Sequence, residues 1–278
     1  MMKRLFIAGI ILWSACSLFA NEQDSIKVEK WLKEAISLPQ DSCRTLHFAK
    51  KMLGMPYVAA TLDGNEEEQL VIHVDRLDCT TFVETVLALC IADKRGVRNF
   101  DGFKKALTDV RYRNGVLDGY ASRLHYFSDW IRNNEQMGFV KECTSETLCA
   151  QSQELWLNFM TTHVDSYQPM KKDPSLVEVM AAQEKKWQGT VVSYIPKEKL
   201  NLPPEELKIK DGDILAMVTN IKGLDIVHVG FAFWKDNHLH LLHASSSVKK
   251  VIEDPKTQYE SSGKTKAHIG VRAIRFVL

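Results

Sequence analysis

The sequence predicts a fold that combines helices with antiparallel β-strands, and two segments carry this prediction. An apolar run that starts at Phe82 has the pattern of a largely buried helix. Two strand-like segments within residues 226–244 flank the polar stretch Lys235-Asp236-Asn237-His238, which is typical of a β-hairpin. The composition, 45% hydrophobic and 26% charged, is that of an ordinary globular protein without repeats.

The N-terminus has the order of a secretory signal peptide. A basic pair and an apolar run occupy residues 3–15, and small residues follow up to Ala20. The run is shorter than the roughly 20 residues that a transmembrane helix needs. We therefore expect removal of residues 1–20 on export across the inner membrane, which leaves residues 21–278 as a single periplasmic domain. A buried N-terminal helix and lipid attachment at Cys16 are the alternatives.

The charge balance argues against two classes of partner. The formal net charge of the chain is +1, and it becomes −1 without residues 1–20, which contain two basic and no acidic residues. A nearly neutral protein has no electrostatic basis for binding nucleic acid or an anionic membrane surface. We expect a monomer with no nucleic-acid partner and no transmembrane segment in the mature chain.

Five cysteines remain after residue 20, and this odd number leaves at least one free thiol in an exported protein. Cys143 and Cys149 are close enough in sequence to pair. Cys90 falls within the apolar helical run and is expected to be a small buried hydrophobic residue. Cys79 is then the cysteine to examine for chemistry.

Cys79 lies at the predicted start of the helix. Asp78 or Thr81 can cap this start, and Thr81 with Glu84 has the spacing of a capping box. Free backbone N–H groups and the helix dipole favour a thiolate at such a position. The same N–H groups can hold an oxyanion when an amide carbonyl is attacked. The alternative is a cysteine that only packs at a helix start.

The predicted hairpin supplies a base for this thiol. If its turn closes symmetrically, Trp234 pairs with Leu239, and Gly230 lies opposite His243. Side chains alternate along a strand, so His228 and His243 share one face as diagonal neighbours about 7–8 Å apart. Gly230 leaves room between the two rings. One imidazole can then act as the base while the other orients it; the alternative is a pair of surface histidines.

A metal site is not expected. His238, His240 and His243 are close in sequence, but the strand period directs His240 away from His243. The chain also lacks the His-x-x-x-His and paired-cysteine spacings of zinc sites. We expect chemistry that needs no cofactor.

Five short motifs follow one another along the chain: Gly54-Met55-Pro56-Tyr57, Asp78-Cys79, Gly212-Asp213-Ile214-Leu215, His228-Val229-Gly230 and His243-Ala244-Ser245. Their order resembles that of the papain-like cell-wall peptidases and amidases of the NlpC type. The resemblance implies an α+β fold with helices packed on a central antiparallel sheet. It also implies a catalytic triad of Cys79, His228 and His243, with Tyr57 near the oxyanion.

The chain departs from the simple NlpC pattern in two places. Thr80-Thr81 replaces the commoner Ser-Gly pair, and a large insert, about residues 100–205, separates the cysteine helix from the sheet. Residues 77–84 and 112–127 resemble a distinct branch, described as N-acetylmuramoyl-L-alanine amidase-like. This resemblance runs from about Trp31 to the C-terminus. It implies cleavage between the muramic acid lactyl group and L-Ala in muropeptides, including anhydro-muropeptides released during wall turnover.

The insert concentrates polar and aromatic residues in a loop, where binding residues tend to lie. Arginine can hold the carboxylates of a muropeptide stem in a bidentate way. The residues that we assign to substrate binding are Asp78, Thr80, Arg113, Arg123, His125 and Tyr126. The alternative for the loop residues is that they fasten the insert to the sheet.

The predicted activity is amide hydrolysis through a thioester on Cys79. An endopeptidase of the same fold, cutting the D-Glu–diaminopimelate bond, would use the same catalytic residues. A non-catalytic wall-binding module would be expected to lack Cys79, His228 or His243, all of which are present. An acyltransferase would resolve the thioester with an amine in place of water.

Overall fold

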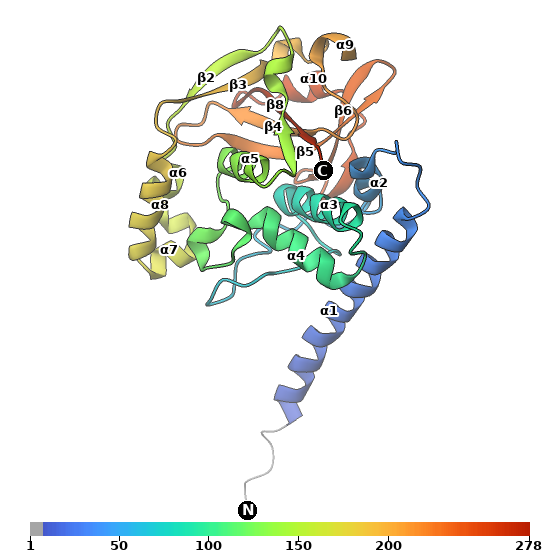
Figure 1. The fold of residues 1–278 in the computed structure, drawn as a ribbon. Helices are drawn as coiled ribbons and strands as arrows, with labels where there is room; N and C mark the ends of the chain where they lie inside the picture. Colours follow the sequence, from blue (N-terminus) through green and yellow to red (C-terminus); the bar gives the residue numbers. More distant parts are fainter. Residues whose placement is uncertain (1–7) are drawn as a thin grey trace, which may run out of the picture.

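The computed structural model describes residues 8–278, with side chains from residue 22 onward. Within this range one antiparallel sheet has the strand order β2-β3-β8-β4-β5-β6-β7, and β1 also pairs with β8 (Figure 1). The strands are β1 Val140–Glu142, β2 Gln151–Leu155, β3 Thr190–Pro196, β4 Ile214–Thr219, β5 Ile226–Lys235, β6 His238–Ser245, β7 Lys250–Glu253 and β8 His268–Phe276. The prediction of an α+β fold with helices on an antiparallel sheet is confirmed.

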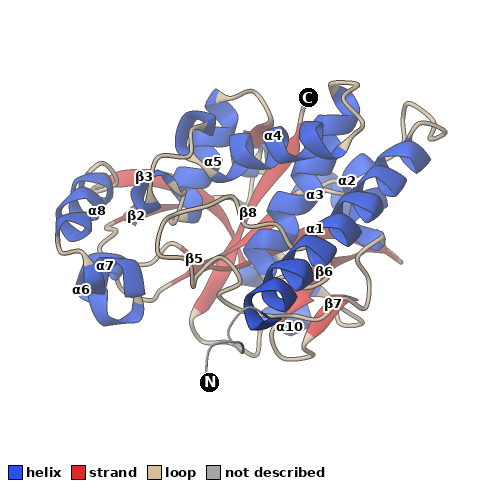
Figure 2. Ribbon diagram, turned by 90° about the horizontal axis from the view of Figure 1, so that it is seen from below, coloured by secondary structure: helices blue, strands red, loops and turns tan. Residues whose placement is uncertain are grey.

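The longer helices lie mostly on one side of this sheet (Figures 1 and 2). The helices are α1 Ala8–Ala35, α2 Arg44–Lys50, α3 Cys79–Lys94, α4 Phe100–Arg111, α5 Phe127–Gln136, α6 Phe159–Thr162, α7 Gln168–Lys172, α8 Ser175–Lys185, α9 Pro204–Leu207 and α10 Gln258–Ser262. In β4, Ile214 and Ala216 pack toward α3, whereas Leu215 and Met217 belong to a second core on the other face. Both faces of the central strands are therefore buried.

Helix α1 joins the body of the protein only through its last turns. Val28, Trp31, Leu32 and Ala35 recur at helical spacing and are buried in the main core. The beginning of α1 projects away from the body (Figure 1). Residues 1–7, the start of the predicted signal peptide, lie outside the described residues. None of the described helices is long and apolar enough to cross a membrane.

The segment predicted as an insert does not stand apart from the sheet. Its strands β2 and β3 pair with each other, and β3 and β1 pair with β8, so three strands of this segment extend the sheet. Helices α6, α7 and α8 lie together at one end of the molecule (Figures 1 and 2). A small core of their own includes Tyr126, Met160, Met180 and Trp187.

The five cysteines whose side chains the structure describes, from Cys43 onward, are all free. Cys90 is fully buried in α3, which confirms its prediction as a hydrophobic residue. The pairing considered for Cys143 and Cys149 is not formed. Burial against β8, where its Sγ lies 3.4 Å from the Ala273 carbonyl, holds Cys143 in the second core, whereas Cys149 contacts Thr147.

Candidate active site

Cys79 is the first residue of α3, and Asp78 is the N-cap. The Thr81 N–H donates to Asp78 Oδ1 at 2.8 Å, and the Asp78 N–H donates to Thr81 Oγ1 at 2.9 Å. The capping box is therefore formed by Asp78 and Thr81, and the predicted box of Thr81 with Glu84 is wrong. Glu84 is buried in the helix interior, where Arg111 Nε donates to its carboxylate at 2.7 Å.

The β5–β6 hairpin forms with the predicted register. Asp236 and Asn237 make its two-residue turn with φ of 51° and 59°, the left-handed values that favour Asn and Asp in such turns. Trp234 pairs with Leu239 as predicted. A Cβ on Gly230 would lie only 2.8 Å from the Cβ of His243, so the close approach of the two strands requires glycine there.

The two predicted imidazoles meet. His228 Nε2 lies 2.5 Å from His243 Nδ1, and the rings are nearly perpendicular, with centroids 4.8 Å apart. His240 points elsewhere: its ring stacks on Phe233, and its Nδ1 lies 3.1 Å from the Asp254 carbonyl. The described residues contain no group of three His, Cys, Asp or Glu side chains that could hold a metal ion.

Helix α3 packs on β5, the strand that carries His228. The backbone of Val229, the residue after His228, and the hydroxyl and N–H of Thr80 act to lower the pKa of the Cys79 thiol. The Gly-x-Pro-Tyr motif forms the third side. The Tyr57 N–H donates to the Lys249 carbonyl at 2.9 Å, and this segment also pairs with Leu77, just before the helix.

Burial dominates the electrostatics of the site. It raises the pKa of Cys79 to about 11, with a further contribution from the Asp78 charge, although the Val229 and Thr80 donors oppose the rise. Burial and the neighbouring His243 and His268 lower the pKa of His228 to about 3. The pKa of Tyr57 is raised by burial and by the nearby Cys79 and Asp78 charges. Burial therefore acts against the thiolate that the helix start favours.

The Gly-Asp motif has a structural role. Asp213 is buried and accepts two hydrogen bonds from Arg275, at 2.9 and 2.7 Å. Gly212 has φ of +82°, and a Cβ there would fall 2.1 Å from the Thr45 hydroxyl. The motif thus anchors the start of β4 to the C-terminal strand and to α2, which places the sheet relative to the cysteine helix.

The residues predicted to bind substrate in the insert are engaged within the protein instead. Arg113 makes two contacts with Asp129, and Arg123 makes two with Glu68, at 3.0 and 2.6 Å. The Tyr126 hydroxyl donates to Glu184 at 2.7 Å. These contacts support the fastening role, because a carboxylate already occupies each arginine.

The other three predicted binding residues also have local roles. His125 Nε2 lies 3.0 Å from the Tyr120 carbonyl, and burial lowers the pKa of His125 to about 3, so it carries no charge for a substrate. The Asp78 carboxylate is used by the helix cap. Thr80 alone remains near the Cys79 thiol, where its hydroxyl and N–H act to lower the pKa of that thiol.

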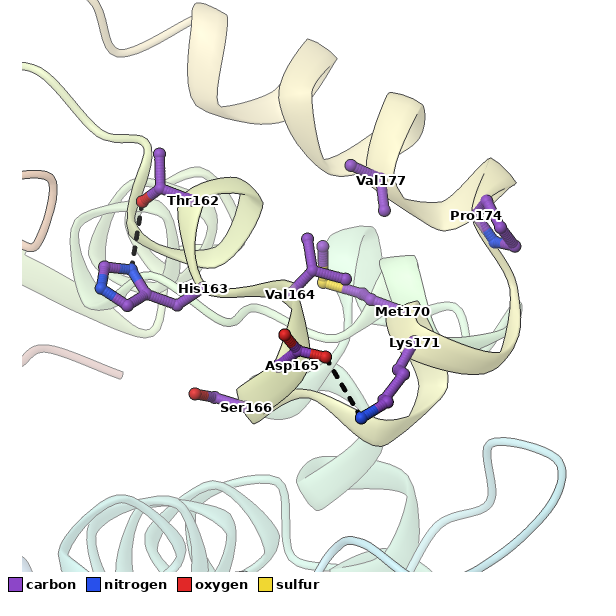
Figure 3. A pocket seen from close by; sticks show the side chains of 9 residues that line it. All are labelled: Thr162, His163, Val164, Asp165, Ser166, Met170, Lys171, Pro174 and Val177. Carbon is purple, nitrogen blue, oxygen red and sulfur yellow. Dashed lines mark hydrogen bonds and ion pairs between the residues drawn. The ribbon is translucent and has the colours of Figure 1, made fainter.

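Two pockets differ in their relation to this site. A pocket of about 540 Å³ is lined by His228, His243, Met217, His268 and Asp254, among others. A pocket of about 610 Å³ lies between α6 and α8, where Lys171 pairs with Asp165 and His163 contacts Thr162 (Figure 3). None of the predicted site residues lines the second pocket.

Asp254 and His268 were not among the predicted site residues, yet they share the first pocket with His228 and His243. The sequence does contain an indication that Asp254 follows a third strand. Val251 and Ile252 form a short apolar pair after a polar turn, which is a weak sign of the third strand that became β7. Extending the hairpin register across this strand would have placed Asp254 near His243.

Known proteins share both the sequence and the fold. Residues 47–266 match the AmiA-like family, described as N-acetylmuramoyl-L-alanine amidase-like. An N-acetylmuramoyl-L-alanine amidase from Bacteroides uniformis is 39% identical, with a TM-score of 0.79 over 84% of this chain and 98% of that one. A Bacteroides fragilis protein, provisionally described as a xylanase, is also 39% identical, with a TM-score of 0.77 over 82% of this chain and 99% of that one.

A more distant neighbour supports the fold alone. A Legionella pneumophila protein is 24% identical, with a TM-score of 0.73 over 94% of this chain and 97% of its own. No curated protein matches the chain. The family match covers most of the sequence, and the Bacteroides structures align over nearly their whole length. This chain therefore belongs to the N-acetylmuramoyl-L-alanine amidase-like family.

Proposed function

We propose that this protein is an exported cysteine amidase that hydrolyses the bond between the N-acetylmuramoyl lactyl group and L-Ala in peptidoglycan fragments. One observation carries the proposal. Cys79 begins helix α3, which packs on β5, the strand that carries His228, and the Nε2 of His228 is 2.5 Å from His243 Nδ1. This arrangement provides a nucleophile, a base and an orienting group of a papain-like hydrolase.

The reaction proceeds in two halves. His228 takes the proton of Cys79 as the sulfur attacks the lactyl carbonyl, so that no free thiolate is required beforehand. The Cys79 N–H and the Tyr57 hydroxyl donate to the oxyanion. The imidazolium of His228 then gives its proton to the leaving amine of L-Ala, which leaves a thioester. Water, deprotonated by His228, attacks this thioester, and the lactyl carboxylate and the thiol are released.

The chemistry of the site favours an amide substrate over a glycoside. Glycosidases place two carboxyl groups on either side of the scissile bond. Here the reacting groups are a thiol and two imidazoles, and the nearby Asp78 carboxylate is committed to the helix cap. We extend the proposal to anhydro-muropeptides and to export, on the signal sequence at residues 1–20 and the resemblance to enzymes of wall turnover.

The test is mass spectrometry of the products from a disaccharide-tetrapeptide muropeptide, in its reduced and anhydro forms. The wild type should release free tetrapeptide and disaccharide, and Cys79→Ala should release neither while it keeps the wild-type melting temperature. Cys149→Ala, which changes a thiol near neither histidine, should behave as wild type. A disaccharide-dipeptide product would instead place the cut at the D-Glu–diaminopimelate bond, and activity in Cys79→Ala would refute the mechanism.

Export has its own test. Cell fractionation and N-terminal sequencing should find the protein in the periplasm with Asn21 as its first residue. A mature chain that begins at a lipid-modified Cys16 would replace soluble export with membrane anchoring. Retention of residues 1–20 in a cytoplasmic protein would refute both.

A further inference from the structure

The strand register places a carboxylate beside the second histidine. In the β6–β7 pair, Leu242 lies opposite Glu253, and the Asp254 N–H continues the ladder by donating to the Leu241 carbonyl at 2.8 Å. Asp254 is therefore opposite Leu241. Residues opposite one another, and residues two apart on one strand, share a face of the sheet, so Asp254 and His243 are diagonal neighbours on one face.

The same diagonal step relates His228 to His243 across β5 and β6. His228, His243 and Asp254 thus form an oblique row over three adjacent strands. All three line the pocket of about 540 Å³. Helix α10 contacts β6 and β8 and contributes Gln258, Ser261 and Ser262 to the lining of this pocket.

The hydrogen bonds of the pair leave one buried nitrogen without a partner. His228 Nε2 is taken by His243, so Nδ1 of His228 is the nitrogen free to receive the Cys79 proton. In that tautomer His228 carries its hydrogen on Nε2 and donates it to His243 Nδ1. His243 then carries its own hydrogen on Nε2, and this atom is buried with no hydrogen-bond partner among the described residues.

We propose that Asp254 is a positioning residue that holds the Nε2–H of His243 through one water and so completes a row Cys79–His228–His243–Asp254. This inference rests on the proposed cysteine mechanism. Asp254 is the one acidic side chain among the described residues that line the pocket. Its Oδ1 accepts from the Lys256 N–H and its Oδ2 from Ser261 Oγ, both at 3.0 Å, which fixes the carboxylate and leaves further lone pairs open.

The charges around the pair agree with this role. Burial lowers the pKa of His243, and the Asp254 charge acts against that fall. The other titratable side chains that line the pocket are basic: Lys256, Lys264 and His268. The negative charge of Asp254 therefore lies among positively charged and neutral groups. When His228 becomes imidazolium by taking the Cys79 proton, His243 and Asp254 stabilise the positive charge without receiving the proton themselves.

The kinetic test compares Asp254→Asn with two controls. Asp254→Asn should lower kcat about tenfold with little change in KM, which is less than the roughly 100- to 10,000-fold contribution of an acid–base group itself, because Asp254 acts only through His243. Glu253→Gln removes the neighbouring charge on β7 and should retain wild-type kcat. Ser261→Ala removes one of the two contacts that fix the carboxylate but keeps the charge of Asp254, so it should lose clearly less kcat than Asp254→Asn. Asp254→Glu should recover part of the activity. A kcat within twofold of wild type in Asp254→Asn, or an equal loss in Ser261→Ala, would overturn the proposal.

A second measurement does not depend on turnover. Histidine ¹⁵N NMR of the wild type and of Cys79→Ala should show His243 protonated on Nε2 at neutral pH. In Asp254→Asn its titration midpoint should shift to lower pH, because the opposing charge is gone. An Nδ1–H tautomer, or an unchanged midpoint, would refute the role of Asp254. Failure of the wild type to cleave any muropeptide would instead refute the proposed function, and the NMR result would still decide the contact.

Discussion

At the scale of single residues, Cys79 is subject to two opposing influences. The first turn of α3 offers N–H donors and a positive dipole end, which favour the thiolate. Burial against β5 disfavours any charge, and it raises the pKa of Cys79 to about 11 while it lowers that of His228 to about 3. Burial therefore favours the neutral forms of both groups and acts against the helix dipole at Cys79.

The reactivity of the thiol should show this directly. Peptide-level mass spectrometry after brief iodoacetamide treatment should give an alkylation midpoint for Cys79 near pH 11, above the 9.0 of an ordinary thiol. The same cysteine in the urea-unfolded chain supplies the reference. A midpoint below 9 in the folded protein would show that Cys79 and His228 rest as a thiolate–imidazolium pair.

Tyr57 provides the second residue-scale prediction. Tyr57→Phe removes one hydroxyl donor from the proposed oxyanion site and should lower kcat about 100-fold, which corresponds to the loss of one such donor. KM and the melting temperature should change little, because the described hydrogen bonds of this segment are made by its backbone. Steady-state kinetics on a defined muropeptide measure both constants. An unchanged kcat would remove Tyr57 from the mechanism.

At the scale of elements, the β5–β6 hairpin sets the geometry of the base. Its two-residue turn fixes the register, and the register puts His228 and His243 on one face with Gly230 opposite His243. A one-residue slip would move both rings to the other face of the sheet. The turn residues are therefore as important for the site as the histidines themselves.

Gly230→Ala tests this dependence. The new Cβ would lie 2.8 Å from His243 Cβ and 2.9 Å from the Leu242 carbonyl, so the strands must separate. We expect a destabilisation of about 1–3 kcal/mol and a loss of activity as His243 moves. Urea unfolding and kcat measure the two effects. Gly263→Ala, whose Cβ would meet its nearest atom at 3.7 Å, is the control and should be close to wild type in both.

At the scale of the whole molecule, the insert and the loop between Tyr57 and Leu77 are tied together by charged pairs. Arg123 holds Glu68 of this loop, and the Tyr112 hydroxyl donates to the same carboxylate at 2.9 Å. Arg111 connects α4 to Glu84 in α3 and donates to the Val71 carbonyl at 2.6 Å. Both ends of the loop adjoin the site, so these contacts hold Tyr57 and Cys79 in place from outside.

A double-mutant cycle distinguishes fastening from substrate binding at Arg123. Arg123→Ala and Glu68→Ala should each destabilise the protein by about 3–5 kcal/mol, since each leaves a largely buried partner unpaired. The double mutant should lose much less than the sum of the two. Urea unfolding gives the coupling free energy. Additive effects on stability, together with a rise in KM only for Arg123→Ala, would restore the substrate-binding role of the arginine.

The pattern of neighbouring residues in the sequence predicted some of these features correctly and others not. The helix at Cys79 and the hairpin register follow from apolar periodicity and turn chemistry, which act between near neighbours, and both predictions were confirmed. The Thr81–Glu84 box was wrong because Glu84 is recruited by Arg111 from another helix. The raised pKa of Cys79 follows from burial by β5, and no local pattern reports that.

The sequence by itself determined which residues are present for chemistry, and where the chain forms the cysteine helix and the histidine hairpin. These depend on contacts a few residues apart. Only the tertiary structure decided which polar side chains have partners within the protein. Arg113 and Arg123 pair with carboxylates from other parts of the chain, and Asp254 lies diagonal to His243. The physical reason is that a buried charge is stabilised by partners from distant segments, and the fold alone selects those partners.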